Sequence, residues 1–145
     1  MDYTTVVGFI EHVGSTNMTN LMNQYTGAAA ILSRQEQLLN SAEGRLNGYA
    51  SMLYTIPLPV SDAIRGIVYD IATYFLYRQM EGDDVPTRIK ELYKGAIESC
   101  KEIRDNKWQP PPDDSGNTVV AKASGSSYDT ESVDPVFDDD EMKYY

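Results

Sequence analysis

The chain has 145 residues, which suits one domain with its own core and leaves little room for a second. Its 12 basic and 22 acidic residues give a formal net charge of −10, which argues against binding to a phosphate backbone. The mean hydropathy of −0.43 and the lack of a long apolar run argue against a membrane protein. The single cysteine, Cys100, excludes a disulfide within the chain and favours a reducing compartment.

Helical periodicity predicts four helices, over roughly residues 5–13, 28–53, 61–80 and 86–106, with a single extra turn near 18–23. Two prolines at 57 and 59 end the second helix, and Ser61 can cap the third. Pro86 occupies a favoured first-turn position of the fourth. The predicted fold is all-α, a small bundle of about four helices with long antiparallel helices and an extended C-terminal arm.

The predicted helix over 61–80 is apolar nearly all round. Ile64, Ile67 and Ile71 mark one face, and a second group of apolar residues falls toward the other side. Either this helix is central in the bundle, or its second face meets another subunit, and we favour the subunit interface. The predicted interface residues on this helix are Tyr69, Leu76, Tyr77 and Met80.

The composition changes after Trp108. Residues 1–108 carry 13 acidic and 10 basic residues, whereas residues 109–145 carry 9 acidic and 2 basic ones. Three successive prolines open the second part and favour an extended segment, and glycine, serine and aspartate follow. We therefore predict a helical body over 1–108 and an acidic, Pro/Gly/Ser-rich extended arm over 109–145.

The arm is not uniformly polar. Val119 and Val120 could form a short strand, and apolar residues gather at the end of the chain. The predicted contact residues there are Val136, Phe137, Met142, Tyr144 and Tyr145. An ordinary disordered tail is one explanation, and an arm that orders when it meets a partner is the other.

Residue patterns that carry catalysis are scarce. His12 is the single histidine, so no zinc site of the usual spacing is expected, and Cys100 lies on the apolar stripe of the last helix. No phosphate-binding glycine motif occurs, and the acidic run at 138–141 lacks the spacing of a calcium loop. We predict a structural or binding protein with no catalytic, cofactor or metal site, and not an enzyme.

Several short sequence runs in the predicted body are similar to runs found in a known protein family. They are residues 46–49 (LNGY), 54–59 (YTIPLP), 70–77 (DIATYFLY) and 88–97 (RIKELYKGAI). The opening run at 7–14 and the apolar-aromatic C-terminal end fit the same pattern. Together they resemble the phage Mu-like small head–tail connector, or head completion, proteins of tailed phages.

The resemblance implies a structural virion protein located in the neck, at the head–tail junction, and made in the host cytoplasm. Such a protein would assemble as a ring below the portal, dodecameric if it matches the portal, and link the portal to the tail or to a stopper or terminator protein. DNA would pass through the channel without sequence-specific binding, and no membrane would be involved. The alternative is a soluble acidic adaptor or regulatory protein that binds a basic partner.

Overall fold

The computed structural model describes residues 1–82 and 84–122. Within these residues the chain forms five helices and no strand, which confirms the all-α prediction. The helices are α1 (Val6–Val13), α2 (Ser15–Leu21), α3 (Ala28–Ala50), α4 (Asp62–Glu81) and α5 (Thr87–Arg104). The single turn expected near residues 18–23 is the short helix α2, which makes one helix more than predicted. Gly14, at a positive φ of 97°, separates α1 from α2.

Local sequence signals explain where the helices begin. The Thr5 hydroxyl accepts a hydrogen bond from the Gly8 N–H at 3.0 Å and caps α1. Ser61 caps α4 as predicted, because its hydroxyl accepts the Ile64 N–H at 3.3 Å. Pro86 directly precedes the first residue of α5, where a missing N–H has no helical partner to lose.

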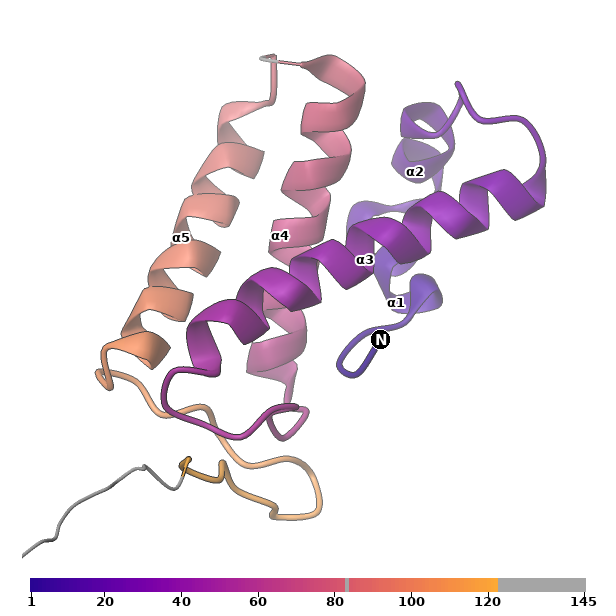
Figure 1. Cartoon of the computed structure of the whole chain (residues 1–145). Coiled ribbons are helices and arrows are strands. Elements are labelled where there is room, and N and C mark those ends of the chain that lie inside the picture. The colour runs from indigo at the N-terminus through magenta and orange to yellow at the C-terminus, as the bar shows by residue number, and fades with distance from the viewer. Residues whose placement is uncertain (83, 123–145) are drawn as a thin grey trace, which may run out of the picture.

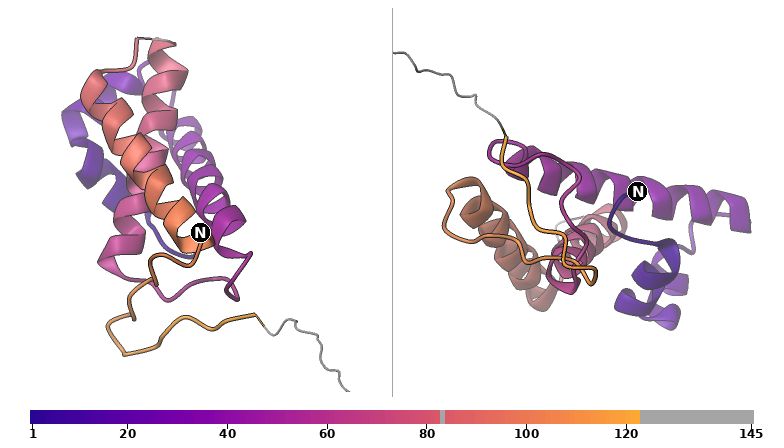
Figure 2. Two further views of the ribbon diagram at one scale, coloured as in Figure 1. Left: turned by 90° about the vertical axis from the view of Figure 1, so that its left-hand side faces the viewer. Right: turned by 90° about the horizontal axis from the view of Figure 1, so that it is seen from below.

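Helix α4 lies at the centre of the bundle. It contacts α1, α2, α3 and α5. Figure 1 shows α4 and α5 side by side as an antiparallel pair, with α3 crossing them and α1 and α2 on the far side of α4 from α5. The view from below in Figure 2 shows the same arrangement. The fully buried side chains of α4 include Ile64, Val68, Ile71 and Leu76.

This central position accounts for the apolar surface of α4 within the single chain, which is the first of the two explanations given above. The chain itself covers the helix, since no large apolar residue of α4 is among the exposed ones. Leu76, which we predicted in a subunit interface, is completely buried within the single chain. The four helices that pack around α4 explain why its residues are apolar on nearly every side.

Residues 109–122 run beneath the helices rather than away from them (Figure 1). Pro110 is fully buried, and Ala121 pairs with Tyr54 in an isolated antiparallel bridge. The boundary at residue 108 stays a prediction, but the first part of the predicted arm contacts the body. Residues 123–145 lie outside the described part of the chain.

Candidate functional site

Glu43 of α3 is the one buried acidic residue in the described part of the chain, and its carboxylate binds the N-terminal segment. Its carboxylate accepts the backbone N–H groups of Asp2 at 2.8 Å, Tyr3 at 3.1 Å and Thr4 at 3.0 Å. The Thr4 hydroxyl donates to the same carboxylate at 2.6 Å. Because these four donors use the lone pairs of both oxygens, Glu43 holds the N-terminal segment and is not available as an acid or base.

Tyr3 ties the same segment to two further elements. Its hydroxyl donates to Asn47 Oδ1 at 2.6 Å and accepts the Leu58 N–H at 2.8 Å. Burial raises the pKa of Tyr3 above its ordinary value, although the Leu58 N–H acts in the opposite direction. The phenol therefore joins α3 to the loop before α4, which is a structural role.

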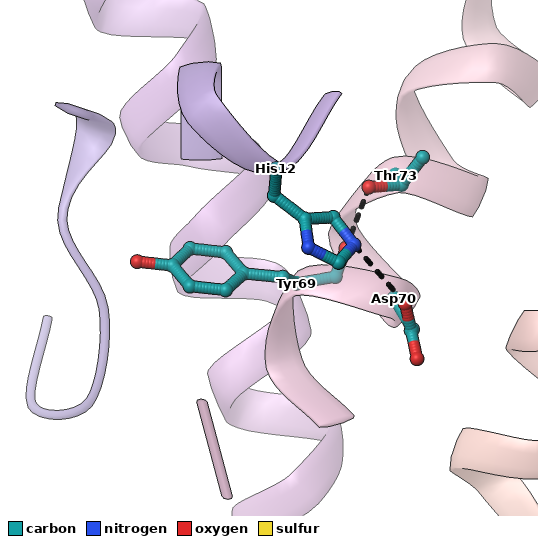
Figure 3. Close-up of polar contacts among 4 residues, drawn as sticks. All are labelled: His12, Tyr69, Asp70 and Thr73. Carbon is teal, nitrogen blue, oxygen red and sulfur yellow. Dashed lines mark hydrogen bonds and ion pairs between the residues drawn. The ribbon is translucent and has the colours of Figure 1, made fainter. Parts of the chain in front are cut away.

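His12, the single histidine, has a structural environment between α1 and α4. Its Nε2 atom lies 3.1 Å from Asp70 Oδ1, and its ring stacks on that of Tyr69 with centroids 5.4 Å apart. Figure 3 shows the imidazole between these two side chains. The Thr73 hydroxyl does not reach the histidine but donates to the Tyr69 carbonyl at 2.7 Å. These contacts connect α1 to α4.

Cys100 is also unsuited to catalysis. It is completely buried, and this burial raises the pKa of its thiol to about 12, although the charge of Arg45 acts in the opposite direction. The thiol is therefore protonated at neutral pH. Among residues 1–82 and 84–122, no group of three potential ligands could hold a metal ion. Nor is any helix of that part long and apolar enough to cross a membrane.

The four predicted interface residues of α4 differ in how far they are buried. Tyr69 is half-buried and takes part in contacts within the chain, since its hydroxyl accepts the Thr5 N–H at 3.3 Å. Tyr77 and Met80 are half-buried and pack against the core, and Leu76 is inside it. The remaining five predicted residues lie outside the described part of the chain: Val136, Phe137, Met142, Tyr144 and Tyr145.

Exposed apolar residues gather instead at one end of the molecule. Three of the seven large exposed ones are Met52 at 65%, Ile56 at 39% and Val120 at 61% exposure. They lie on segments 51–60 and 109–122, which we call the terminal face. The Thr55 N–H donates to the Val120 carbonyl at 2.7 Å, and the Lys122 N–H donates to the Leu53 carbonyl at 2.9 Å.

Sequence reasoning did not identify the terminal face. The possible strand at Val119 and Val120 was the one signal that pointed to it. The pairing partner is a loop some sixty-five residues earlier, and helical periodicity carries no information about it.

The comparisons with known proteins add one match. A protein-family model described as "Bacteriophage Mu, Gp36" matches residues 3–128, a range that includes all five helices and the terminal face. No curated protein matches the chain.

Proposed function

Because the chain belongs to the Bacteriophage Mu Gp36 family, we propose that this phage protein is a head–tail connector of the virion neck. It assembles as a ring below the portal and links the portal to the tail or to a stopper protein. The observation that carries this proposal is the family match over residues 3–128, together with the resemblance of its sequence runs to small connector proteins.

The terminal face supports a docking role. Met52, Ile56 and Val120 expose apolar area there, and exposed apolar residues at one place on a small domain mark an interaction surface. Residues 120–122 pair through their backbone with residues 53–55, and the side chain of Val120 stays 61% exposed beside this pairing. We assign this face to the portal.

A closed ring also needs two different surfaces on each subunit, because its contacts are heterologous. The terminal face lies at one end of the bundle. On the side of the bundle, Tyr77 of α4 and Leu92 of α5 line a small hollow together with the C-terminal end of α1, and Leu92 is 41% exposed. In the proposed ring this hollow belongs to the contact between neighbouring subunits, which retains Tyr77 as an interface residue.

The charge of the chain is consistent with a DNA channel. A net charge of −10 repels a phosphate backbone, so DNA can slide past without being held. The ring therefore guides DNA and reads no sequence.

The test uses the portal of the same phage and native mass spectrometry. The wild-type chain is expected to bind the portal in several copies. Val120→Asp is expected to weaken that binding at least about tenfold, because a charge desolvated in an apolar contact costs more than 1.4 kcal/mol. Val7→Asp is the matched control, since Val7 is 66% exposed in the first turn of α1, where an acid is tolerated.

Two results would contradict the proposal. One is a chain that stays monomeric both alone and with the portal. The other is equal portal binding by Val120→Asp and the wild type. Salt-sensitive binding of a monomer to an unrelated basic protein would favour the acidic adaptor instead.

A further inference from the structure

Four of the chain's six arginines line one groove along the solvent-facing side of α3. The groove consists of two adjoining hollows that share Ser41 and Arg45. Arg104 of α5 lines the hollow toward the C-terminal end of α3, and Arg34 and Arg78 line the other. We call this feature the arginine groove, and no acidic residue lines it.

The charges in the arginine groove are largely uncompensated. Of its four arginines, Arg104 alone forms an ion pair within the described residues, with Asp105 at 2.8 Å. Arg34 is held by the side-chain amides of Gln37 and Gln79. Clustered cations repel one another, so the cluster favours an anionic ligand.

The side chain of Arg45 contacts only uncharged groups among the contacts of the described residues. Arg45 donates to the Tyr93 hydroxyl at 3.2 Å and lies 5.5 Å above the Phe75 ring. Neither partner carries a negative charge, so Arg45 can pair with an anion that enters the groove.

The shape of the groove fits a peptide with apolar residues beside its charges. Gly44 and Gly48 leave open space on its floor, because a Cβ built at either position meets nothing within 4 Å. Tyr49 and the exposed Met52 make one end of the groove apolar. The ligand should therefore combine several carboxylates with at least one large apolar side chain.

The chain carries such a segment at its own C-terminus. Asp138, Asp139, Asp140 and Glu141 are consecutive, with Phe137 before them and Met142 after them. We propose that the arginine groove binds residues 135–145 of the same molecule. This proposal concerns an intramolecular contact and does not depend on the connector function.

The position of the last described residue supports docking within one molecule. The Lys122 N–H bonds to the Leu53 carbonyl, next to Met52 at the apolar end of the groove. A flexible chain as long as residues 123–134 has a root-mean-square span of about 20 Å, and the groove extends over about 24 Å along α3 from Ala50 to Arg34. A tether of this length gives an effective concentration on the order of millimolar.

Nucleic acid is the other polyanion that arginines bind. A phosphate backbone must approach a chain of net charge −10 from solution, against long-range repulsion. The C-terminal segment is also acidic, but it is attached to the chain and so needs no approach from solution, and the observations favour it.

The first experiment changes the tail and observes the groove by NMR of the full-length protein. In D138N/D139N/D140N/E141Q, the amide signals of Ser41, Gly44 and Gly48 should move away from their wild-type positions. The wild-type signals should move to the same positions at about 1 M NaCl, where screening acts within about 3 Å. The control D129N/E131Q/D134N removes three tail acids outside the segment and should leave the signals unchanged.

The second experiment changes the groove and observes the tail. R45Q/R78Q replaces two exposed arginines of the groove, so the fold should be retained and checked by circular dichroism. The amide signals of Phe137, Met142 and Tyr144 should then move to their high-salt positions. The matched control is R65Q/R88Q, which removes the same charge from arginines outside the groove and should leave the tail signals unchanged.

Three outcomes would overturn the proposal. The groove signals could be the same in the wild type and in the tail variant. Their positions could change with protein concentration, which would assign the tail to the groove of a second molecule. Duplex DNA could move the groove signals of the wild type at physiological salt, which would assign the groove to nucleic acid.

Discussion

The two ends of the described chain are attached to the helices in opposite ways. At the N-terminus, residues 2–4 bind through a buried carboxylate and a buried phenol, Glu43 and Tyr3. At the other end, residues 118–122 bind mainly through backbone pairs to a surface loop, and the Val120 side chain stays in solvent. Buried polar anchors lose much when broken, whereas surface backbone pairs leave side chains available for other contacts.

This difference indicates that the two ends have different roles. The N-terminal segment completes the fold, because it joins α3 to the loop before α4. The segment 109–122 presents the terminal face, which we assign to the portal. A substitution at the first end should therefore change stability, and one at the second should change binding.

Glu43→Ala is expected to have the largest effect on folding. It leaves three backbone N–H groups and the Thr4 hydroxyl without their acceptor, so the free energy of unfolding should fall by at least about 3 kcal/mol. Urea unfolding measures the loss. Glu43→Gln retains one acceptor oxygen and should lose less, and a loss below about 0.5 kcal/mol for Glu43→Ala would show that the N-terminal segment is not part of the fold.

Tyr3→Phe tests the second anchor. The ring stays in place while Asn47 Oδ1 and the Leu58 N–H lose their partner, so the free energy of unfolding should fall by about 1–2 kcal/mol. Tyr25→Phe is a suitable control, because the Tyr25 side chain is only partly buried and no side-chain hydrogen bond involves it among the described residues. Equal effects of the two substitutions would contradict the anchor.

The same phenol predicts a loss of stability at alkaline pH. Burial raises the pKa of Tyr3 in the folded protein above the ordinary value of 10.0. Its contribution is therefore complete below pH 10 and is lost as the pH rises through the raised value. The stability difference between the wild type and Tyr3→Phe should shrink over that range. A difference that stays constant with pH would contradict this assignment.

Val120→Asp should have the smallest effect on folding. Its side chain is 61% exposed, so the free energy of unfolding should change by less than about 0.5 kcal/mol. Urea unfolding alongside Glu43→Ala provides the direct comparison between the two ends. A large loss would mean that the terminal face belongs to the core, and reduced portal binding could then not be assigned to a lost contact.

Much of the fold follows from local signals in the sequence. The predicted bounds of α4 and α5 were correct to within a few residues. They followed from the Ser61 cap, the prolines before α4 and the apolar stripe of α5. The coverage of α4 did not follow, since periodicity shows that a face is apolar but not whether its own chain or another one covers it. The partners of Glu43 lie about 40 residues away, and no local pattern connects them.

The arginine groove was partly accessible from the sequence. Arg34, Ser41, Arg45 and Gly48 recur at helical spacing and so share one face of α3. The contributions of Arg78 and Arg104 depend on how α4 and α5 pack against α3, and tertiary structure alone provides that information.

Cryo-electron microscopy of the neck of the phage that encodes this chain tests the connector function most directly. The proposal predicts a ring of copies directly below the portal, with residues 51–60 and 109–122 buried against it. A neck that lacks the chain, or a ring whose terminal face points into solvent, would contradict the proposal.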